Sequence, residues 1–266
     1  MKFICLLIPL FLCSLIGCVE YHPYDMKTDG QRFVNSTNIS KIEKICDGRT
    51  SIRFAVVSDS QRWYDELDKI VGAINGYDNI DFVIHAGDLT DFGLKTEFER
   101  QRDILNKLKI PYVCLIGNHD CIAMGKSLYY RIFGNPDFSF VAGNVKFLCL
   151  NTNMLEYRDD ANVPNMDFME SQLLEIEPGV EKSVAVMHAQ PRSDQFYCDS
   201  TSQAFHGRLL QFPDLQFCIH GHGHIYKEED IFGDGLMYYE CDDIGDKSFL
   251  IFTIDERGYS CEKIGY

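Results

Sequence analysis

The stretch Phe82-Val83-Ile84-His85-Ala86-Gly87-Asp88-Leu89-Thr90-Asp91 decides how this chain is organised. An apolar run typical of a buried strand ends there in a glycine and a carboxylate. Such an ending places Asp88 at the carboxyl end of a strand, where open α/β sheets bind their ligands. The residue types around Asp88 make it a candidate ligand shared by two metal ions.

Four further stretches follow the same pattern, in which a β-branched or aromatic run ends in Asp, Asn or His. They are residues 54–61, 112–120, 183–188 and 217–224. Because buried strands deliver their last side chains to one edge of a sheet, we expect the five ends to converge. Between them, apolar periodicity predicts helices over 64–75, 96–108, 168–176 and 202–210, strands over 138–141 and 146–151, and strands and turns over 231–264.

The amino terminus predicts a targeting segment over residues 1–17. Lys2 is followed by an apolar run that is too short for a comfortable membrane span but suits a signal peptide. The ending Leu15-Ile16-Gly17-Cys18 resembles a bacterial lipobox, so Cys18 would carry lipid and tether an exported protein to the periplasmic or cell-surface face of a membrane. An ordinary cleaved signal or a retained anchor is the alternative.

The rest of the chain predicts a tether and one large domain. Residues 18–50, which begin with the lipidated cysteine, are polar and mixed, and we expect them to become ordered only where they pack on the domain. Residues 51–266 are enough for one domain with a substantial core. We expect a monomer.

Net charge and cysteine spacing exclude two classes of function. The chain carries a formal net charge of −15, and so acidic a surface repels the phosphate backbone of nucleic acids, which makes nucleic acid an unlikely substrate. None of the eleven cysteines has the spacing of a zinc knuckle or of a disulfide framework.

The polar residues at the strand ends have the chemistry of a metal centre. Carboxylate, carboxamide and imidazole ligands suit Mn²⁺, Fe²⁺, Zn²⁺ or Ca²⁺, and the absence of cysteine at these ends argues against a thiolate zinc site. Two such ions can hold a bridging hydroxide at neutral pH and clamp a phosphoryl group for in-line attack.

Five blocks, in order, resemble the motifs of the calcineurin-like metallophosphoesterase superfamily. They are Asp59-Ser60-Gln61, Gly87-Asp88-Leu89-Thr90-Asp91, Gly117-Asn118-His119-Asp120, His188 and Gly221-His222-Gly223-His224. Any one block is a weak signal, but the ordered set spreads over nearly the whole domain and is specific. The resemblance implies an α/β fold with a β-sandwich flanked by helices, in α/β/β/α order, and two divalent ions, Mn, Fe or Zn.

The resemblance also implies a role for each matching position. Asp88 would bridge both ions. The first ion would be completed by Asp59, Gln61 and His224. The second would be completed by Asn118, His188 and His222.

The catalytic groups follow from the same blocks. His119 would contact the phosphoryl oxygen or protonate the leaving group without binding metal, and Asp120 would orient it. Asp91 would hold a ligand in place. Alternatively, Asp91 and Asp120 only cap backbone N–H groups after a turn. We expect His85 and His220 to be structural.

Gln61 departs from the pattern, because most of the family has histidine at this position. A carboxamide oxygen is a weaker ligand, which favours looser binding or a harder ion such as Mn²⁺. The Asp-x-Gln variant also resembles the manganese-dependent ADP-ribose and CDP-alcohol diphosphatase branch.

Substrate contacts have no comparable pattern. Arg62 follows the first block and offers an arginine fork for phosphate. Arg192, Asp194 and His206 lie in or after the loop beyond His188, where any of them could line the pocket. We expect Trp63 and Tyr64 to pack the start of a helix rather than a substrate ring.

These observations predict hydrolysis of a small phosphodiester or phosphomonoester by metal-bound hydroxide. The alternatives are a nucleotide diphosphatase that cleaves a pyrophosphate bond, as in ADP-ribose, and a non-catalytic binding lipoprotein on the same fold.

Overall fold

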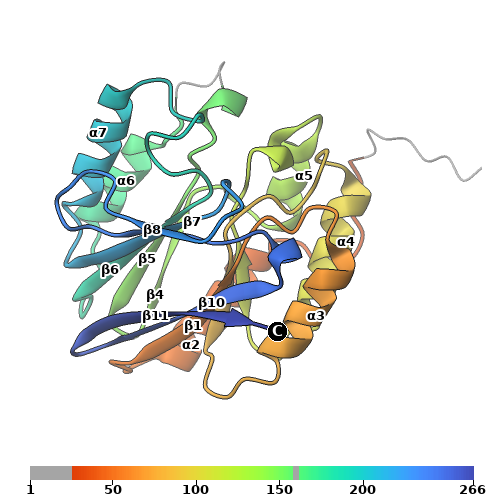
Figure 1. The fold of residues 1–266 in the computed structure, drawn as a ribbon, viewed down its shortest axis with the longest axis horizontal. Coiled ribbons are helices and arrows are strands. Elements are labelled where there is room, and N and C mark those ends of the chain that lie inside the picture. Colours follow the sequence, from red (N-terminus) through yellow and green to blue (C-terminus); the bar gives the residue numbers. More distant parts are fainter. Residues whose placement is uncertain (1–25, 158–161) are drawn as a thin grey trace, which may run out of the picture.

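The fold consists of two β-sheets packed face to face, with helices on both outer sides (Figure 1). The structure is a computed structural model that describes residues 26–157 and 162–266. Its two sheets and flanking helices confirm the predicted architecture.

The first sheet has the strand order β11-β10-β1-β2-β3. Its members are β1 (Ile52–Val57), β2 (Phe82–His85), β3 (Tyr112–Cys114), β10 (Ser248–Asp255) and β11 (Gly258–Gly265). β1, β2 and β3 pair in parallel, so their carboxyl ends lie at one edge. β10 and β11 form an antiparallel hairpin beside β1.

The second sheet has the order β4-β5-β6-β7-β9-β8. Its members are β4 (Phe138–Ala142), β5 (Val145–Leu150), β6 (Lys182–Met187), β7 (Leu215–His220), β8 (Lys227–Glu229) and β9 (Tyr238–Glu240). β5, β6, β7 and β9 are parallel neighbours. The parallel strands of both sheets therefore direct the loops at their carboxyl ends toward the edge where the predicted metal ligands are expected.

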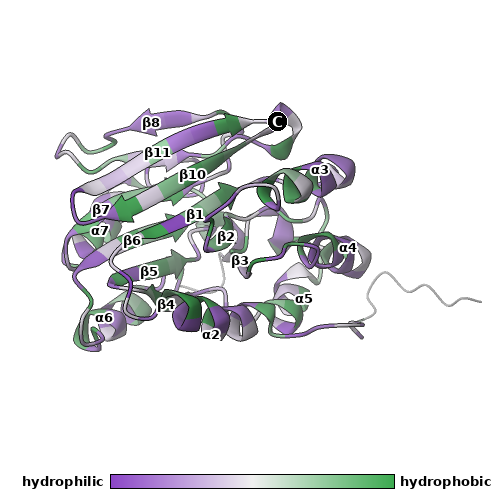
Figure 2. Cartoon of the chain, turned by 90° about the horizontal axis from the view of Figure 1, so that it is seen from below, coloured by the Kyte–Doolittle hydropathy of each residue, from purple (hydrophilic) through white to green (hydrophobic). Residues whose placement is uncertain are grey.

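Three apolar layers hold these elements together. Aromatic rings fill the space between the sheets, where Phe54 stacks on Phe82 with ring centroids 5.1 Å apart and Phe147 meets both rings edge-on. Helices α3 (Tyr64–Ile74), α4 (Lys95–Leu105) and α5 (Gly125–Ile132) bury apolar faces against the first sheet. Helices α6 (Met166–Leu174) and α7 (Asp199–Leu209) cover the second sheet. Figure 2 shows polar colour on the outward faces of α3 and α4.

Helix α2 (Val34–Cys46) lies in the segment that the sequence predicted to be a tether. It packs against both β3 and β4, and its side chains Val34, Ile42 and Cys46 are fully buried. The Asn35 side chain accepts a hydrogen bond from the Cys114 N–H and donates one to the Cys114 carbonyl. α2 is therefore an integral part of the fold that satisfies the free edge of β3.

The predicted signal peptide and Cys18 lie outside the described residues. Among the residues that the structure does describe, no helix has the length and apolar character needed to cross a membrane. All eight cysteines within residues 26–157 and 162–266 are free thiols.

Candidate metal centre

Three predicted ligands of the first ion meet at the carboxyl edge of the sheets. One ligand atom from each of Asp59, Asp88 and His224 lies within 4.8 Å of the other two. Asp59 follows β1, Asp88 follows β2, and His224 lies in the loop after β7. The structure thus brings together residues that are up to 165 positions apart in the sequence.

The predicted ligands of the second ion converge beside this group. Asn118 Oδ1 lies 3.1 Å from His188 Nε2 and 3.0 Å from His222 Nδ1. His188 Nε2 is also 3.3 Å from Asp88 Oδ2. Asp88 consequently belongs to both groups, as a ligand that bridges two ions must.

The donor set fits divalent metal ions because it contains buried oxygens without partners. Asp59 Oδ1 and Gln61 Oε1 are buried and receive no hydrogen bond, although His224 Nε2 lies 3.2 Å from Asp59 Oδ1. Leaving a buried polar oxygen unsatisfied costs about 1–3 kcal/mol. A cation bound at this point would satisfy both oxygens, including the one from the variant residue Gln61.

The backbone at the site adopts a conformation that is costly for residues with a Cβ atom. Asp59, Asp88, His222 and His224 have φ angles between 53° and 76°, which cost about 1–3 kcal/mol each for non-glycine residues. Such strain persists only where the surrounding structure enforces it. A Cβ atom on Gly117 would collide with Asp88, so the glycine permits this close approach.

Buried hydrogen bonds hold the first block in place. His85 Nε2 lies 2.7 Å from Ser60 Oγ, and Ser60 Oγ donates to Gln101 Oε1 over 3.1 Å. Gln101 Nε2 donates in turn to the Ser60 carbonyl. Burial lowers the pKa of His85 to about 4, so it is neutral near pH 7. His85 is a structural support, as predicted, and the contribution of Gln101 had no signal in the sequence.

The electrostatics of the site favour positive charge. Burial alone would lower the pKa of His188, but the Asp88 and Asp59 carboxylates and the Ala86 carbonyl together outweigh burial and raise the pKa to about 10. A proton on His188 would balance the buried carboxylates without metal. Because metal ligation requires the neutral imidazole, metal binding displaces this proton.

His119 is oriented by Asp91 rather than by Asp120. The His119 ring Nδ1 lies 3.1 Å from the Asp91 backbone carbonyl. The backbone N–H of His119 donates to Asp88 Oδ1 over 2.9 Å. The ring is thus fixed next to the bridging carboxylate, with Nε2 as the nitrogen available to a substrate. The orienting group is the backbone carbonyl of Asp91, whereas the Asp91 carboxylate, predicted to hold a metal ligand in place, accepts hydrogen bonds from Arg62.

The prediction that Asp120 orients the His119 ring is wrong. The Asp120 carboxylate accepts hydrogen bonds from the backbone N–H groups of Leu89, Thr90 and Gly117. It therefore ties the second and third blocks together, as the alternative of a capping residue stated. Burial, together with the charge of Asp88, raises the pKa of Asp120 to about 7.

Of the three basic residues predicted as substrate contacts, only Arg62 is placed next to the site. Arg62 Nη2 lies 2.5 Å from Asp91 Oδ1, and its side chain is exposed. The prediction for His206 is wrong, because its buried ring lies between Tyr238 and Asp234 and stacks on Phe232. Arg192 is also engaged elsewhere: it bonds to Asp199 and to the Ile231 carbonyl.

Two carboxylates outside the motifs, Asp194 and Asp243, lie beside the candidate histidine ligands. Asp194 Oδ1 lies 2.7 Å from His222 Nε2, the nitrogen opposite the one that faces Asn118. Asp243 Oδ2 lies 3.7 Å from His224 Nδ1. A carboxylate at hydrogen-bond distance, as Asp194 is, fixes the tautomer and orientation of a metal-binding histidine, whereas Asp243 is beyond that distance. Both carboxylates come from loops without a motif, so the sequence held no signal for their positions beside the histidines.

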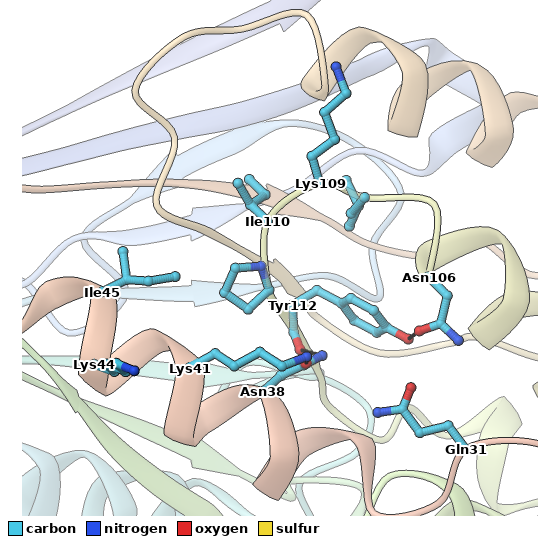
Figure 3. Close-up of a pocket in the computed structure, with 11 residues that line it drawn as sticks. Gln31, Asn38, Lys41, Lys44, Ile45, Asn106, Lys109, Ile110 and Tyr112 are labelled. Atoms are coloured by element: carbon cyan, nitrogen blue, oxygen red, sulfur yellow. Dashed lines mark hydrogen bonds between the residues drawn. The ribbon is translucent and has the colours of Figure 1, made fainter.

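A separate pocket of about 350 Å³ lies between α2 and the loop that precedes β3 (Figure 3). Lys41, Lys44, Ile45, Lys109 and Tyr112 are among its lining residues. None of the candidate ligands lines this pocket. This pocket is therefore distinct from the candidate metal centre.

Comparison with known proteins assigns the family. Residues 52–226 match the calcineurin-like phosphoesterase family, and the chain belongs to this family, which indicates a metal-dependent phosphoric ester hydrolase. Members generally hold divalent metal ions in a dinuclear site.

Individual relatives agree with this assignment. The chain is 28% identical over 151 residues to a 3′,5′-cyclic-nucleotide phosphodiesterase from Nostoc sp., and the alignment covers 54% of this chain and 56% of that relative. A dimetal phosphatase from Danio rerio has a TM-score of 0.58 at 13% identity, covering 81% of this chain and 99% of that one. A purple acid phosphatase from yellow lupin seeds has a TM-score of 0.62 at 13% identity, covering 82% and 52%. The two structural likenesses concern the fold alone.

Proposed function

We propose that this protein hydrolyses a small phosphodiester or phosphomonoester at a dinuclear metal centre, with a phosphodiester as the favoured substrate. The observation that carries the proposal is the position of Asp88, which lies in both ligand groups and accepts the His119 N–H. The similarity to a cyclic-nucleotide phosphodiesterase supports the choice of a diester.

The residues of the chain divide the work between binding and proton transfer. Two bound divalent ions supply Lewis acidity, activation of the attacking water and neutralisation of the phosphoryl oxygens. The seven candidate ligands would hold them: Asp59, Gln61, Asp88, Asn118, His188, His222 and His224. His119 donates a hydrogen bond to the phosphoryl oxygen or a proton to the leaving-group oxygen through Nε2.

The buried carboxylates explain why such a site needs metal. Asp59 and Asp88 are nearly inaccessible to solvent, and their negative charge would repel a phosphate group. Bound cations would offset this negative charge and make the local electrostatic potential favourable for a phosphate group. A nucleotide diphosphatase remains the second candidate, because the carboxamide of Gln61 suits a harder ion such as Mn²⁺.

Hydrolysis assays on the purified protein test these alternatives. The protein is stripped of metal, reloaded with Mn²⁺, Zn²⁺, Fe²⁺ or Ca²⁺, and offered bis(4-nitrophenyl) phosphate, 3′,5′-cyclic AMP, 4-nitrophenyl phosphate and ADP-ribose. We expect the diesters to turn over fastest. Preference for ADP-ribose would favour the diphosphatase.

Two variants provide the controls for this assay. Asp88→Asn should abolish turnover and lower the number of bound ions, whereas His119→Ala should reduce turnover while both ions remain bound. Tight binding of two ions without turnover of any substrate would instead support the non-catalytic binding protein.

We also propose that the protein is an exported lipoprotein, monomeric and anchored through Cys18. The lipobox-like ending supports this proposal. Metabolic labelling with a fatty-acid analogue should mark the wild-type protein and leave Cys18→Ser unlabelled. Labelling of both proteins, or of neither, would argue against lipidation at Cys18.

A further inference from the structure

Two large apolar side chains stand in solvent beside the candidate catalytic histidine. Phe92 is 60% exposed and Ile122 is 39% exposed. Apolar side chains that cluster on a surface next to a site often mark a binding surface. Neither residue belongs to the motifs that carry the metal ligands.

Backbone contacts place both residues next to His119. The Ile122 N–H donates to the His119 carbonyl over 3.2 Å. On the other side, the His119 ring bonds to the Asp91 carbonyl, and Phe92 is the next residue in the chain. The histidine is therefore flanked by two loops that each carry one exposed apolar side chain.

The two loops also abut one another. Gly93 has a left-handed backbone, with φ 64°, and a Cβ atom on it would collide with the Ile122 carbonyl. This contact brings the backbone beside Phe92 against the backbone of Ile122. The backbone segments that carry Phe92 and Ile122 therefore lie against each other, and we call these two residues the apolar pair.

Hydrogen bonds fix the loop that presents Phe92. Glu97 Oε2 accepts from the Phe92 N–H over 3.1 Å and from the Leu94 N–H over 3.0 Å. The Gly93 N–H donates to Thr90 Oγ1, which in turn donates to Asp120. These hydrogen bonds hold the backbone of the loop in the conformation in which the Phe92 side chain is exposed.

We propose that the apolar pair, Phe92 and Ile122, forms the subsite for the leaving group of the substrate. The inference rests on the proposed hydrolase function, in which His119 meets the leaving-group oxygen. A leaving group next to His119 lies next to the apolar pair, so the preferred leaving group is an uncharged alcohol that carries an aromatic or apolar moiety. Ring-to-ring and ring-to-aliphatic contact then removes apolar surface from water.

The test compares two phosphoesters that differ in the leaving alcohol: phenyl phosphate, with an aromatic leaving group, and 2-glycerol phosphate, with a polar one. The methyl diesters of the same two alcohols replace them if the wild type turns over only diesters, and the released alcohol is measured in each case. Each variant is compared with the wild type on the same substrate, which cancels the different intrinsic reactivity of the two esters.

Phe92→Ala and Ile122→Ala should each lower kcat/KM for phenyl phosphate, with about a tenfold loss for Phe92→Ala, equivalent to about 1.4 kcal/mol. The loss should appear mainly as a higher KM, because the contact binds ground state and transition state alike. Hydrolysis of 2-glycerol phosphate should stay within about twofold of the wild type. Phe92→Leu should recover part of the loss.

Leu174→Ala is the matched control, because Leu174 is 80% exposed on α6, away from the motifs, and should leave both substrates unchanged. An equal loss on both substrates, or no loss on either, would overturn the leaving-group subsite while the hydrolase function stands. A wild-type protein that hydrolyses neither ester nor any diester in any metal would overturn both proposals.

Discussion

At the residue scale, the two histidines of the Gly221–His224 block use different ring nitrogens. His222 faces the second ion position with Nδ1, and His224 faces the first with Nε2. The outward nitrogen of His222 is held by Asp194. A single carboxylate outside the motifs therefore selects which nitrogen of His222 is presented to the metal.

The contact between Asp194 and His222 predicts an effect on metal affinity. Asp194→Asn should weaken binding of the second ion by roughly 10- to 100-fold, the usual effect of losing such a partner. Metal titration by calorimetry measures this directly, without any assay of activity. Asp199→Asn is a control for loss of a nearby exposed carboxylate, since Asp199 pairs with Arg192 and not with a candidate ligand. Equal affinities in wild type and Asp194→Asn would show that the contact does not position His222.

A second residue-scale prediction concerns the pH dependence of stability at Asp137. This partly buried carboxylate accepts a hydrogen bond from the Asn151 N–H, and burial raises its pKa to about 6. Because the folded-state pKa lies above the unfolded value, the contribution of Asp137 to stability is greatest below about pH 4 and is lost as pH rises through about 6.

The variant Asp137→Asn should remove this dependence while keeping an acceptor oxygen. Between pH 4 and pH 7 the wild type should lose about 2 kcal/mol of unfolding free energy relative to the variant. Urea denaturation at several pH values gives the difference. Parallel pH profiles for the two proteins would mean that the pKa of Asp137 is not raised.

At the element scale, α2 supplies hydrogen-bond partners for backbone groups on the unpaired edge of β3. β3 pairs with β2 on one side, and on the other side Asn35 and Asn38 donate to the carbonyls of Cys114 and Tyr112. Both asparagines are buried, so in this fold they are not accessible to glycosylation, although each begins an acceptor sequence. The helix closes the sheet against other strands.

Removal of the Asn35 side chain should therefore destabilise the whole fold. Asn35→Ala leaves the Cys114 N–H buried without an acceptor, while the Cys114 carbonyl keeps the Tyr129 hydroxyl as a donor, and we expect a loss of about 2 kcal/mol. Chemical denaturation measures the change. The adjacent exposed residue provides the control, since Ser36→Ala should change stability by less than about 0.5 kcal/mol. A similar small effect for both variants would show that α2 is not needed to satisfy β3.

At the scale of the whole molecule, the carboxyl ends of strands from both sheets carry the candidate metal centre. The chain is strongly acidic overall, and Asp59 and Asp88 concentrate negative charge at this edge. Bound cations would join loops from both sheets and offset their repulsion. Metal binding and folding stability should consequently be coupled.

Metal removal should lower the melting temperature. A divalent ion present at 100 times its Kd stabilises the native state by about 2.7 kcal/mol per site. We expect a clear fall in Tm after treatment with a chelator and recovery on reloading with Mn²⁺ or Zn²⁺, measured by scanning calorimetry. Asp88→Asn should show a much smaller metal-dependent shift. An unchanged Tm in the wild type would contradict a metal centre that links the two sheets.

The ordered motifs make most of the candidate centre predictable, because strand endings are local and parallel strands share an edge. Asp88, Asn118 and His222 could therefore be predicted as candidate ligands from the sequence. The outcome for Asp120 and His206 differed because the partners of a side chain depend on which loops meet. His206 lies between the fourth and fifth blocks in sequence, yet its ring contacts Asp234 and Phe232 rather than the candidate ligands.

The sequence alone determined the five ordered blocks and the family resemblance that they carry, and this resemblance implied the two-layer architecture and the seven candidate ligands. Only the tertiary structure decided that α2 seals β3, that the Asp91 carbonyl orients His119, and that Asp194 supports His222. Each of these contacts joins segments whose separation in the chain is set by intervening loops and helices. Their hydrogen bonds form only when distant parts of the chain meet, and no local pattern encodes that meeting.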